Sequence, residues 1–393
     1  MLEVWSGCCL YVVMSKLGVE VGCWRRPSPR RDEEHGTHPS PRADRILRHI
    51  LTERTFQTHP ISLETQVKIN MMPFVKISAL DAGHITLPER LFITSADPDK
   101  RATVPSLSFL IQHPSPSLNS PNRTTNIIFD LGVKRDLTAY TAAQQAHIAQ
   151  RQPVIVTPDC ADSLRNGNLD PADVDIVILS HVHWDHIGTP SDFANATFAV
   201  GAGTLDLLKN GAGYLYPKEL FNHDELPVDR TVEFPVVSGI NDGPKRTETP
   251  GDTRALLPNP ADKWKWKQLG AFPNALDVFG DGTVWVIDSP GHLYGHVNLL
   301  VKTEEKKWVY LGGDCCHDPR ILSGESGIAM YDDGRGGLRS VHVDTETASC
   351  TLERIRKFFR EKQEEGVEVE VIMAHDSVWR EENLERFWPR YLE

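Results

Sequence analysis

The sequence predicts an α+β fold, and two observations support this prediction. The first is a set of apolar, strand-like runs that each end on a histidine or an aspartate; they are residues 174–180, 283–287, 308–311 and 369–374. The second is a stretch near the C-terminus, residues 347–359, whose apolar positions fall on one helical face and which Gly366 would end. The chain therefore combines strands that finish on metal-capable residues with at least one outer helix.

The first strand-like run leads into the motif HVHWDH, which contains four metal-capable side chains: His181, His183, Asp185 and His186. In an extended segment, residues i and i+2 point the same way, so His181 and His183 can offer two imidazoles to one cation. Asp185 and His186 reach a neighbouring position as the chain turns. Imidazole with carboxylate suits zinc best, with iron, manganese and cobalt as further possibilities.

Three later residues extend this donor set. His292 follows the second run in the motif SPGH, Asp314 follows the third in LGGD, and His375 follows the fourth. His296, four residues past His292, is interpreted as an orienting or packing residue near the site rather than a ligand. The sequence thus predicts a metal site assembled from several strand ends.

This order of motifs resembles the metallo-β-lactamase superfamily, whose pattern is His-x-His-x-Asp-His, then Pro-Gly-His, then Gly-Asp, then a late His. The resemblance covers roughly residues 73–376, and the DLG sequence beginning at Asp130 matches the Asp-x-Gly of the family's early hairpin. It implies a four-layer αββα sandwich with the metals in a cleft at one edge of the two sheets.

The resemblance also implies two zinc ions per chain. It would assign His181, His183 and His292 to one ion, and Asp185, His186 and His375 to the other. Asp314 would bridge the two ions.

Within the superfamily, the chain is most similar to lactonases of the acyl-homoserine-lactone type and their fungal relatives. Residues 75–83 open the domain as theirs do, and residues 104–111 resemble their next strand. True β-lactamases usually lack an aspartate at the position of Asp314. Those lactonases commonly carry a tyrosine three positions after the bridging aspartate, where this chain has His317. Acyl-homoserine lactones are therefore one candidate substrate among several.

The predicted function is a zinc-dependent hydrolase that opens a lactone, or a related cyclic amide, of a small organic molecule. Water held between two divalent cations loses a proton near neutral pH and becomes the nucleophile, as a metal-bridging hydroxide. Asp185 or Asp314 would move the proton to the leaving group. His317 would bind the substrate oxygen or act as an acid; the alternative is a histidine that only supports the ligands or is exposed. The alternatives are a thioester or linear-ester hydrolase, a mono-iron persulfide dioxygenase, and a scaffold that only binds.

Composition limits the partners. The formal net charge of -12 disfavours binding to nucleic acid, and no apolar run reaches the length needed to span a membrane, so a small-molecule substrate is expected. The seven cysteines show no zinc-knuckle or disulfide-framework spacing, which favours reduced thiols and a cytoplasmic location.

The chain is predicted to have two parts. Within residues 1–70, the stretches 24–31 and 38–42 are basic and proline-rich without periodicity, which predicts a disordered N-terminal extension over residues 1–70. Residues 71–393 would form the catalytic domain, with an insertion at about 209–275 that is rich in Gly, Pro and aromatic residues. Such an insertion could be a lid or a substrate wall, although packing onto the body of the domain explains its aromatic residues equally well.

Overall fold

The computed structural model describes residues 74–115, 123–237 and 264–392, together with three strands before residue 26. The chain divides into two compact units, Met1–Ile69 and Asn70–Glu393. In the first unit, β1 (Val4–Trp5), β2 (Cys8–Ser15) and β3 (Gly18–Arg25) form an antiparallel sheet. Most of residues 1–70 lie outside the described residues, so the expected disordered extension stays a prediction.

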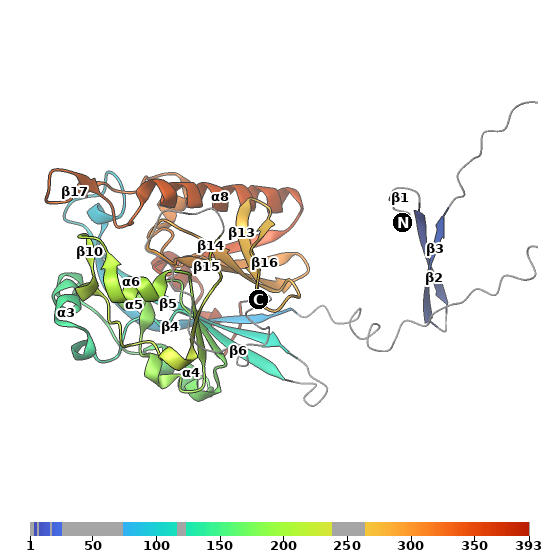
Figure 1. Cartoon of the computed structure of the whole chain (residues 1–393), viewed down its shortest axis with the longest axis horizontal. Helices are drawn as coiled ribbons and strands as arrows, with labels where there is room; N and C mark the ends of the chain where they lie inside the picture. Colours follow the sequence, from blue (N-terminus) through green and yellow to red (C-terminus); the bar gives the residue numbers. More distant parts are fainter. Residues whose placement is uncertain are drawn as a thin grey trace, which may run out of the picture. The chain divides into compact units, whose positions relative to one another are not determined.

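The second unit contains two six-stranded sheets (Figure 1). The first sheet has the order β11-β8-β7-β6-β5-β4, in which β4, β5 and β6 pair antiparallel and the remaining neighbours pair parallel. Its strands are β4 (Lys76–Pro88), β5 (Arg101–Pro114), β6 (Thr124–Phe129), β7 (Ile176–Ile178), β8 (Thr197–Val200) and β11 (Thr231–Glu233).

The second sheet is an antiparallel meander that ends in one parallel pair, β16 with β19. Its strands are β12 (Lys267–Leu269), β13 (Phe272–Asp277), β14 (Val284–Asp288), β15 (Val297–Glu304), β16 (Lys307–Leu311) and β19 (Glu368–Ile372). Three of these, β14, β16 and β19, coincide within one or two residues with strand-like runs of the sequence.

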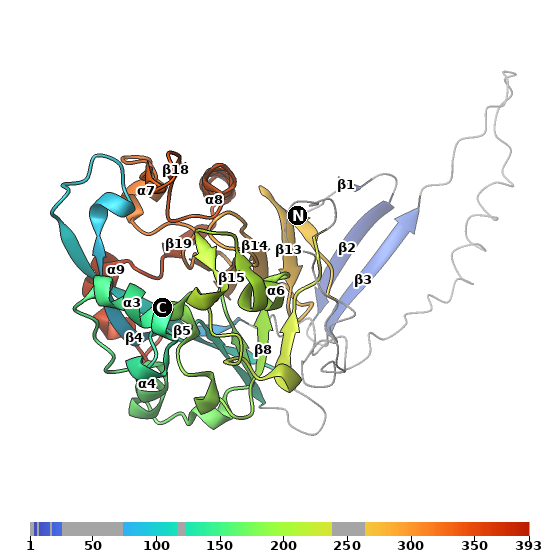
Figure 2. The same cartoon turned by 60° about the vertical axis from the view of Figure 1, so that its left-hand side comes forward.

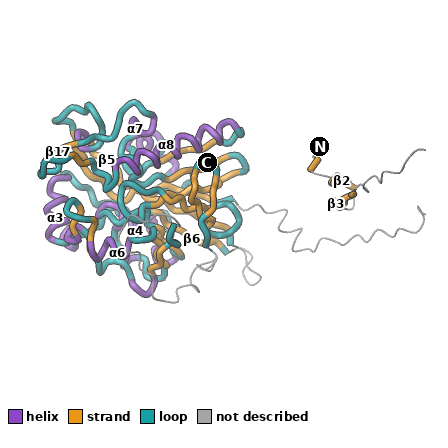
Figure 3. The backbone as a smooth tube through the Cα atoms, turned by 45° about the horizontal axis from the view of Figure 1, so that its top comes forward, coloured by secondary structure: helices purple, strands orange, loops and turns teal. Residues whose placement is uncertain are grey.

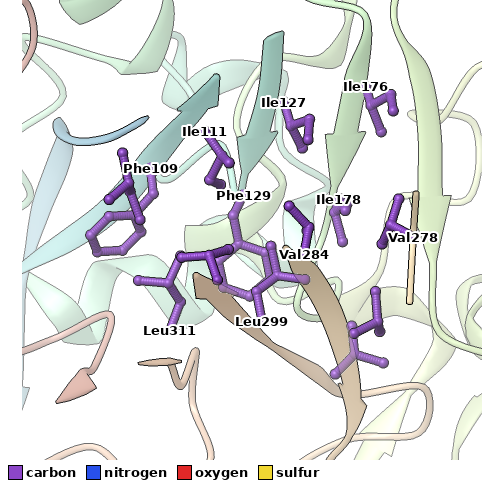
Figure 4. Packing of buried hydrophobic residues seen from close by; sticks show 14 of the residues in the cluster. Phe109, Ile111, Ile127, Phe129, Ile176, Ile178, Val278, Val284, Leu299 and Leu311 are labelled. Atoms are coloured by element: carbon purple, nitrogen blue, oxygen red, sulfur yellow. The ribbon is translucent and has the colours of Figure 1, made fainter. Parts of the chain in front are cut away.

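Successive residues of each strand pack on opposite faces, as the two-residue period of a strand requires. In β6, Ile127 and Phe129 face the second sheet, whereas Ile128 belongs to the cluster on the outer face. Figure 4 shows the inner cluster, where Phe129 of the first sheet meets Leu299 of the second. Both faces of β6 are therefore buried, which explains why Ile127, Ile128 and Phe129 are all apolar.

Helices cover the two outer faces and complete the αββα sandwich. Leu164 of α4 (Cys160–Asn166) and Leu207 of α6 (Thr204–Asn210) pack on the first sheet. Three apolar side chains of α8 (Thr345–Glu364) pack on the second sheet, so the helix expected over residues 347–359 is present and longer than expected. Figure 2 shows α8 end-on above this sheet. No helix in the described part of the chain is both long and apolar enough to cross a membrane.

Shorter elements surround one end of the sandwich. They are the helices α3 (Ala142–Ile148), α5 (Trp184–Ile187), α7 (Pro319–Ser323) and α9 (Ser377–Glu382), the ribbon of β9 (Gly211–Ala212) with β10 (Tyr216–Pro217), and the ribbon of β17 (Tyr331–Asp332) with β18 (Leu338–Arg339).

The stretch expected as an insertion, residues 209–275, is partly built into the sandwich. It supplies β11 to the first sheet and β12 with the start of β13 to the second. Phe234 and Trp264 from this stretch are buried in the inner cluster, with their rings 5.1 Å apart. Packing onto the body thus accounts for these two aromatic residues, and residues 238–263 lie outside the described part of the chain.

Candidate metal centre

Ends of strands from both sheets meet at one edge of the sandwich and carry the metal-capable residues. His181 follows β7 of the first sheet, whereas His292, Asp314 and His375 follow β14, β16 and β19 of the second. Because β16 and β19 are parallel neighbours, their carboxyl ends bring Asp314 and His375 together. All four side chains are buried.

Three histidines form one compact set of nitrogen donors. His183 Nδ1 lies 2.9 Å from His181 Nε2 and 3.0 Å from His292 Nε2. Helix α5 begins directly after His183, whose carbonyl oxygen accepts from the backbone N–H of His186 and Ile187. This turn separates the two halves of the HVHWDH motif. His181, His183 and His292 are called the first donor group below.

Asp185, His186 and His375 form the second donor group. His375 Nε2 lies 3.6 Å from Asp185 Oδ2. All seven residues that the sequence predicts as ligands are therefore brought together, with Asp314 as the seventh.

Asp314 stands between the two groups and turns one oxygen toward each. Its Oδ2 lies 3.4 Å from His292 Nε2 and 3.7 Å from His181 Nε2 in the first donor group. Its Oδ1 lies 3.2 Å from both His186 Nε2 and His375 Nε2 in the second. A carboxylate in this position can be shared by two cations.

The donor atoms fit divalent cations. Each group offers ligand atoms within 4.8 Å of one another, and the ligand types are imidazole and carboxylate, as zinc prefers. His186 Nε2 and Asp314 Oδ1 are buried, and in the described chain they face other donors of the centre rather than separate hydrogen-bond partners. Cations between the donors would satisfy these buried polar atoms.

The second ring nitrogen of several donors is held by a partner behind the centre. His375 Nδ1 donates to the carbonyl oxygen of Pro105 at 2.7 Å. Asp130 Oδ2 lies 2.9 Å from His186 Nδ1 and accepts from Ser180 Oγ at 2.7 Å, and that hydroxyl is 3.0 Å from His181 Nδ1. Such partners fix the orientation of the rings and leave the other nitrogen free to bind metal. The DLG motif thus positions both halves of the centre.

His296 is an orienting residue, as its spacing suggests. Its Nδ1 donates to the carbonyl oxygen of Ser289 at 3.1 Å, and its Nε2 accepts from the backbone N–H of Asp314 at 3.2 Å. Burial lowers the pKa of His296 to about 3, so the ring is neutral and can make one donor and one acceptor contact. His296 thereby ties the loop that precedes His292 to the loop that carries Asp314.

The glycines in the GGD and PGH motifs allow the backbone to approach closely. Gly313 has φ +47°, and a Cβ there would lie 2.8 Å from Ser180 Cβ. A Cβ on Gly291, with φ +127°, would lie 2.3 Å from the backbone nitrogen of Ala348 in α8. Larger residues at either position would displace the following donor.

Burial and neighbouring charges act differently on the donors: against the effect of burial, the carboxylate of Asp314 raises the pKa of His186 and His375 above its usual value, whereas Asp314 and His183 are held in their ligand forms. Burial alone would raise the pKa of Asp314, but His186 and His375 hold it well below its usual range. Burial lowers the pKa of His183 to about 4, so its ring is neutral at physiological pH. Carboxylate and neutral imidazole are the states that bind divalent cations.

A pocket with a cavity volume of about 120 Å³ opens over the centre. We call both donor groups and Asp314 the pocket floor; of these, His183, Asp185, His292, Asp314 and His375 line the pocket. The walls are apolar: Ile85, Leu87, Phe92, Trp184, Leu220, Phe221 and Val341. The pocket rim is a set of polar and charged side chains: Gln144, His147, Arg151, Tyr331 and Arg339.

His317 lines the pocket, as the proposed catalytic role requires. Its Nε2 lies 3.1 Å from Asp314 Oδ2, and its ring lies 4.8 Å from that of Phe92. Its Nδ1 is buried and has no hydrogen-bond partner within the described chain.

Sequence reasoning missed several residues around the centre. His342 Nδ1 lies 3.2 Å from His292 Nδ1, and the two rings form a further group of possible metal ligands with His317. No strand-like run precedes His342, so the signal that marks the other donors is absent there. The rim residues Arg151 and Arg339 likewise belong to no motif.

Comparison with known proteins agrees with this architecture. The sequence pattern described as the metallo-beta-lactamase superfamily matches residues 104–312. Cytochrome P450 monooxygenase mpaDE of Penicillium brevicompactum is 28% identical over 325 residues, which are 77% of this chain and 33% of that protein. Gamma-lactamase FDB1 of Fusarium pseudograminearum is 30% identical over 216 residues, 54% of this chain and 45% of that protein. The chain thus matches a third to a half of the length of these relatives.

A solved structure shares the fold. The structure of an N-acyl homoserine lactone hydrolase, with the product N-hexanoyl-L-homoserine bound at its catalytic metal centre, superposes with a TM-score of 0.53. The match covers 82% of this chain and 100% of that chain at 17% sequence identity, so it speaks for the fold alone.

Proposed function

The chain belongs to the metallo-beta-lactamase superfamily, and from that premise we propose that it is a zinc-dependent hydrolase that opens a lactone, or a related cyclic amide, of a small organic molecule. The observation that carries the proposal is the position of Asp314, whose two oxygens face the two donor groups within one pocket floor. A centre of this form suits two cations that share one carboxylate.

Two divalent cations bound by the two donor groups would lower the pKa of a water and polarise the scissile carbonyl. The chain itself would orient the substrate and handle the proton. Water adds to the carbonyl carbon, the ring C–O or C–N bond breaks, and Asp185 carries the proton from the water to the leaving ring atom. His317 lies beside Asp314 with a free Nδ1, so it would hold the substrate oxygen.

The pocket supports a small organic substrate. Its apolar walls are open above the floor, and the rings of Tyr216 and Phe221 stack on His183 with centroids 5.8 and 6.3 Å away. Apolar walls exclude water around the reacting carbonyl and strengthen the electrostatic interactions at the floor.

Metal analysis combined with a substrate screen tests the proposal. The purified chain should contain close to two zinc ions and hydrolyse members of a panel of lactones and cyclic amides faster than thioesters. A single iron with oxidation of a persulfide, or full hydrolysis by metal-free protein, would contradict it.

A further inference from the structure

Two arginines from elements far apart in the sequence face the same pocket. Arg151 ends a short 3-10 helix, Ala149–Arg151, directly after α3, and Arg339 lies in β18 of the ribbon with β17. Figures 1 and 3 show α3 and β17 at the same end of the molecule. The pocket rim thus carries a guanidinium on two opposing elements.

Neither guanidinium forms an ion pair with a carboxylate of the described residues. Arg339 Nε donates to the carbonyl oxygen of Ser340 at 3.3 Å, and its guanidinium carbon lies 5.3 Å from the centroid of the Tyr216 ring. Arg151 is half-buried and makes no ion pair with a described carboxylate; burial lowers its pKa, and the charge of Asp185 acts in the opposite direction.

Two other half-buried arginines of the described chain have carboxylate partners. Arg380 binds both oxygens of Asp81 at 2.6 and 2.7 Å, and Arg386 binds both oxygens of Glu370 at 2.6 Å. The chain has 54 acidic and 42 basic residues, so carboxylates are not scarce. Withdrawing a guanidinium from water is costly unless an anion compensates it, so an anion bound in the pocket would stabilise Arg151 and Arg339.

The pocket rim itself contains no acidic side chain. Asp185 and Asp314 are the only acidic side chains among the residues that line the pocket, and both belong to the pocket floor, where cations would neutralise them. Burial, and then the charge of Arg151, lower the pKa of His147 to about 4, so His147 is neutral at physiological pH. The pocket rim is therefore cationic in an acidic protein.

We propose that Arg151 and Arg339 bind an anionic group, such as a carboxylate, on the substrate while its ring carbonyl lies at the pocket floor; this rests on the proposed function. A planar guanidinium matches a carboxylate with two parallel hydrogen bonds. The walls between rim and floor include the rings of Phe92, Trp184 and Phe221. The substrate class is therefore a lactone or cyclic amide fused to, or bearing, an apolar ring or chain with a carboxylate. A neutral lactone would leave both arginines unpaired.

A matched pair of substrates tests the inference. Dihydrocoumarin bearing a ring carboxylate is compared with the corresponding carboxamide, which has nearly the same shape and no charge. The metal-loaded wild type should prefer the carboxylate. Arg151→Gln and Arg339→Gln should each lower kcat/KM for the carboxylate by about 10- to 100-fold, the range for a charge-assisted hydrogen bond, with less than a three-fold change for the carboxamide.

Control variants separate charge from structure. Arg151→Lys and Arg339→Lys keep the charge and should restore part of the preference. Arg165→Gln removes the same charge from α4, where Arg165 is exposed and outside the pocket, and should leave the preference unchanged. Melting temperatures identify any variant that fails to fold. If a glutamine variant does not fold, the substrate preference of the lysine variant at the same position is used to test the anion site.

A binding measurement distinguishes the two proposals. Naphthalene-2-sulfonate, a weak metal ligand, should bind the metal-loaded protein more tightly than naphthalene-2-sulfonamide, and the glutamine variants should remove that difference. If both lactones are hydrolysed equally by wild type and variants, the anion site is wrong and the hydrolase stands. If no lactone is hydrolysed but sulfonate binding needs the arginines, the hydrolase is wrong and the anion site stands. If both glutamine variants bind the sulfonate as tightly as the wild type does, the proposed anion site is wrong.

Discussion

The pocket floor and the pocket rim are built in different ways. Donors of the floor stand at the ends of strands in two six-stranded sheets, and His181, His186 and Asp314 are almost completely buried. Residues of the rim, such as Arg151 and Arg339, stand on a 3-10 helix and a two-residue strand and are half-buried. The residues of the floor are therefore positioned by the packed core, whereas those of the rim are positioned by short local elements.

This difference separates reaction chemistry from substrate choice. Metal donors need fixed positions, which sheets with packed faces and backing partners such as Asp130 provide. Groups that select a substrate can vary on short surface elements without disturbing the core. Changes at the floor should therefore affect every substrate, whereas changes at the rim should affect only some.

The largest effect is expected for Asp314→Asn. The substitution keeps the size of the side chain but removes the negative charge shared by the two donor groups, so metal should be lost and turnover should fall by roughly 100-fold or more for all substrates. Elemental analysis and kcat/KM for charged and neutral lactones measure both effects.

Asp229→Asn is the matched control, because Asp229 is exposed and distant from the pocket lining. Two bound metals and turnover within a few-fold of wild type in Asp314→Asn would show that the carboxylate does not bridge, and a single-metal mechanism would replace the proposal.

Metal removal should lower the stability of the protein, because the metal ligands of the pocket floor lose their bound cations. Bound ligand stabilises the native state by about 2.7 kcal/mol when its concentration is 100 times Kd, so chelation should lower Tm by roughly 5 °C or more. The same decrease is expected in Arg339→Gln, because the rim does not hold the metal. Scanning calorimetry with and without chelator measures it; an unchanged Tm in the wild type would argue against tight metal binding.

A smaller effect is expected for Asp130→Asn, which touches no metal. Its Oδ1 accepts from the backbone N–H of Ser180 at 2.6 Å, and its Oδ2 holds both Ser180 Oγ and His186. Loss of such a partner costs about 10- to 100-fold in metal affinity. Zinc titration of folded protein, by competition with a coloured chelator, gives the affinity. If the variant bound zinc as tightly as the wild type, Asp130 would not contribute to metal binding through His186.

Much of the pocket floor could be predicted from the sequence, because its donors follow a physical rule. Strands with both faces buried give apolar runs, and the residue at the end of such a run projects at the sheet edge. His292, Asp314 and His375 were found in this way, and the fold followed from the family resemblance of their spacing. The partner role of Asp130 was not predicted, since the contact with His186 joins residues 56 apart in the chain.

The residues of the pocket rim could not be predicted from the sequence, because no local pattern marks them. Arg151 and Arg339 are 188 positions apart in number, and neither stands at the end of an apolar run. Only the folded chain shows that they face one pocket without forming an ion pair with a carboxylate of the described residues. The same holds for His342, which follows an irregular stretch and reaches His292 through tertiary packing.

The smallest effect is expected for Tyr216→Phe, which tests the contact between floor and rim. The ring of Tyr216 stacks on His183 with centroids 5.8 Å apart and lies under Arg339, and its hydroxyl donates to the carbonyl oxygen of Val341 at 2.6 Å. Removing this hydroxyl should cost about 0.5–1.5 kcal/mol of stability and leave the metal in place, since the ring remains against His183.

Because Val341 follows β18, the loss should loosen Arg339 and reduce the preference for a carboxylate substrate by a few-fold. Tyr391→Phe, which removes a 3.3 Å hydrogen bond to Gln112 away from the pocket, is the control. Metal content, Tm and the ratio of kcat/KM for the charged and neutral lactones decide the outcome. If Tyr216→Phe lost zinc but kept the same ratio of kcat/KM for the two lactones, Tyr216 would support the metal donors rather than Arg339. Tyr216 would then belong to the pocket floor.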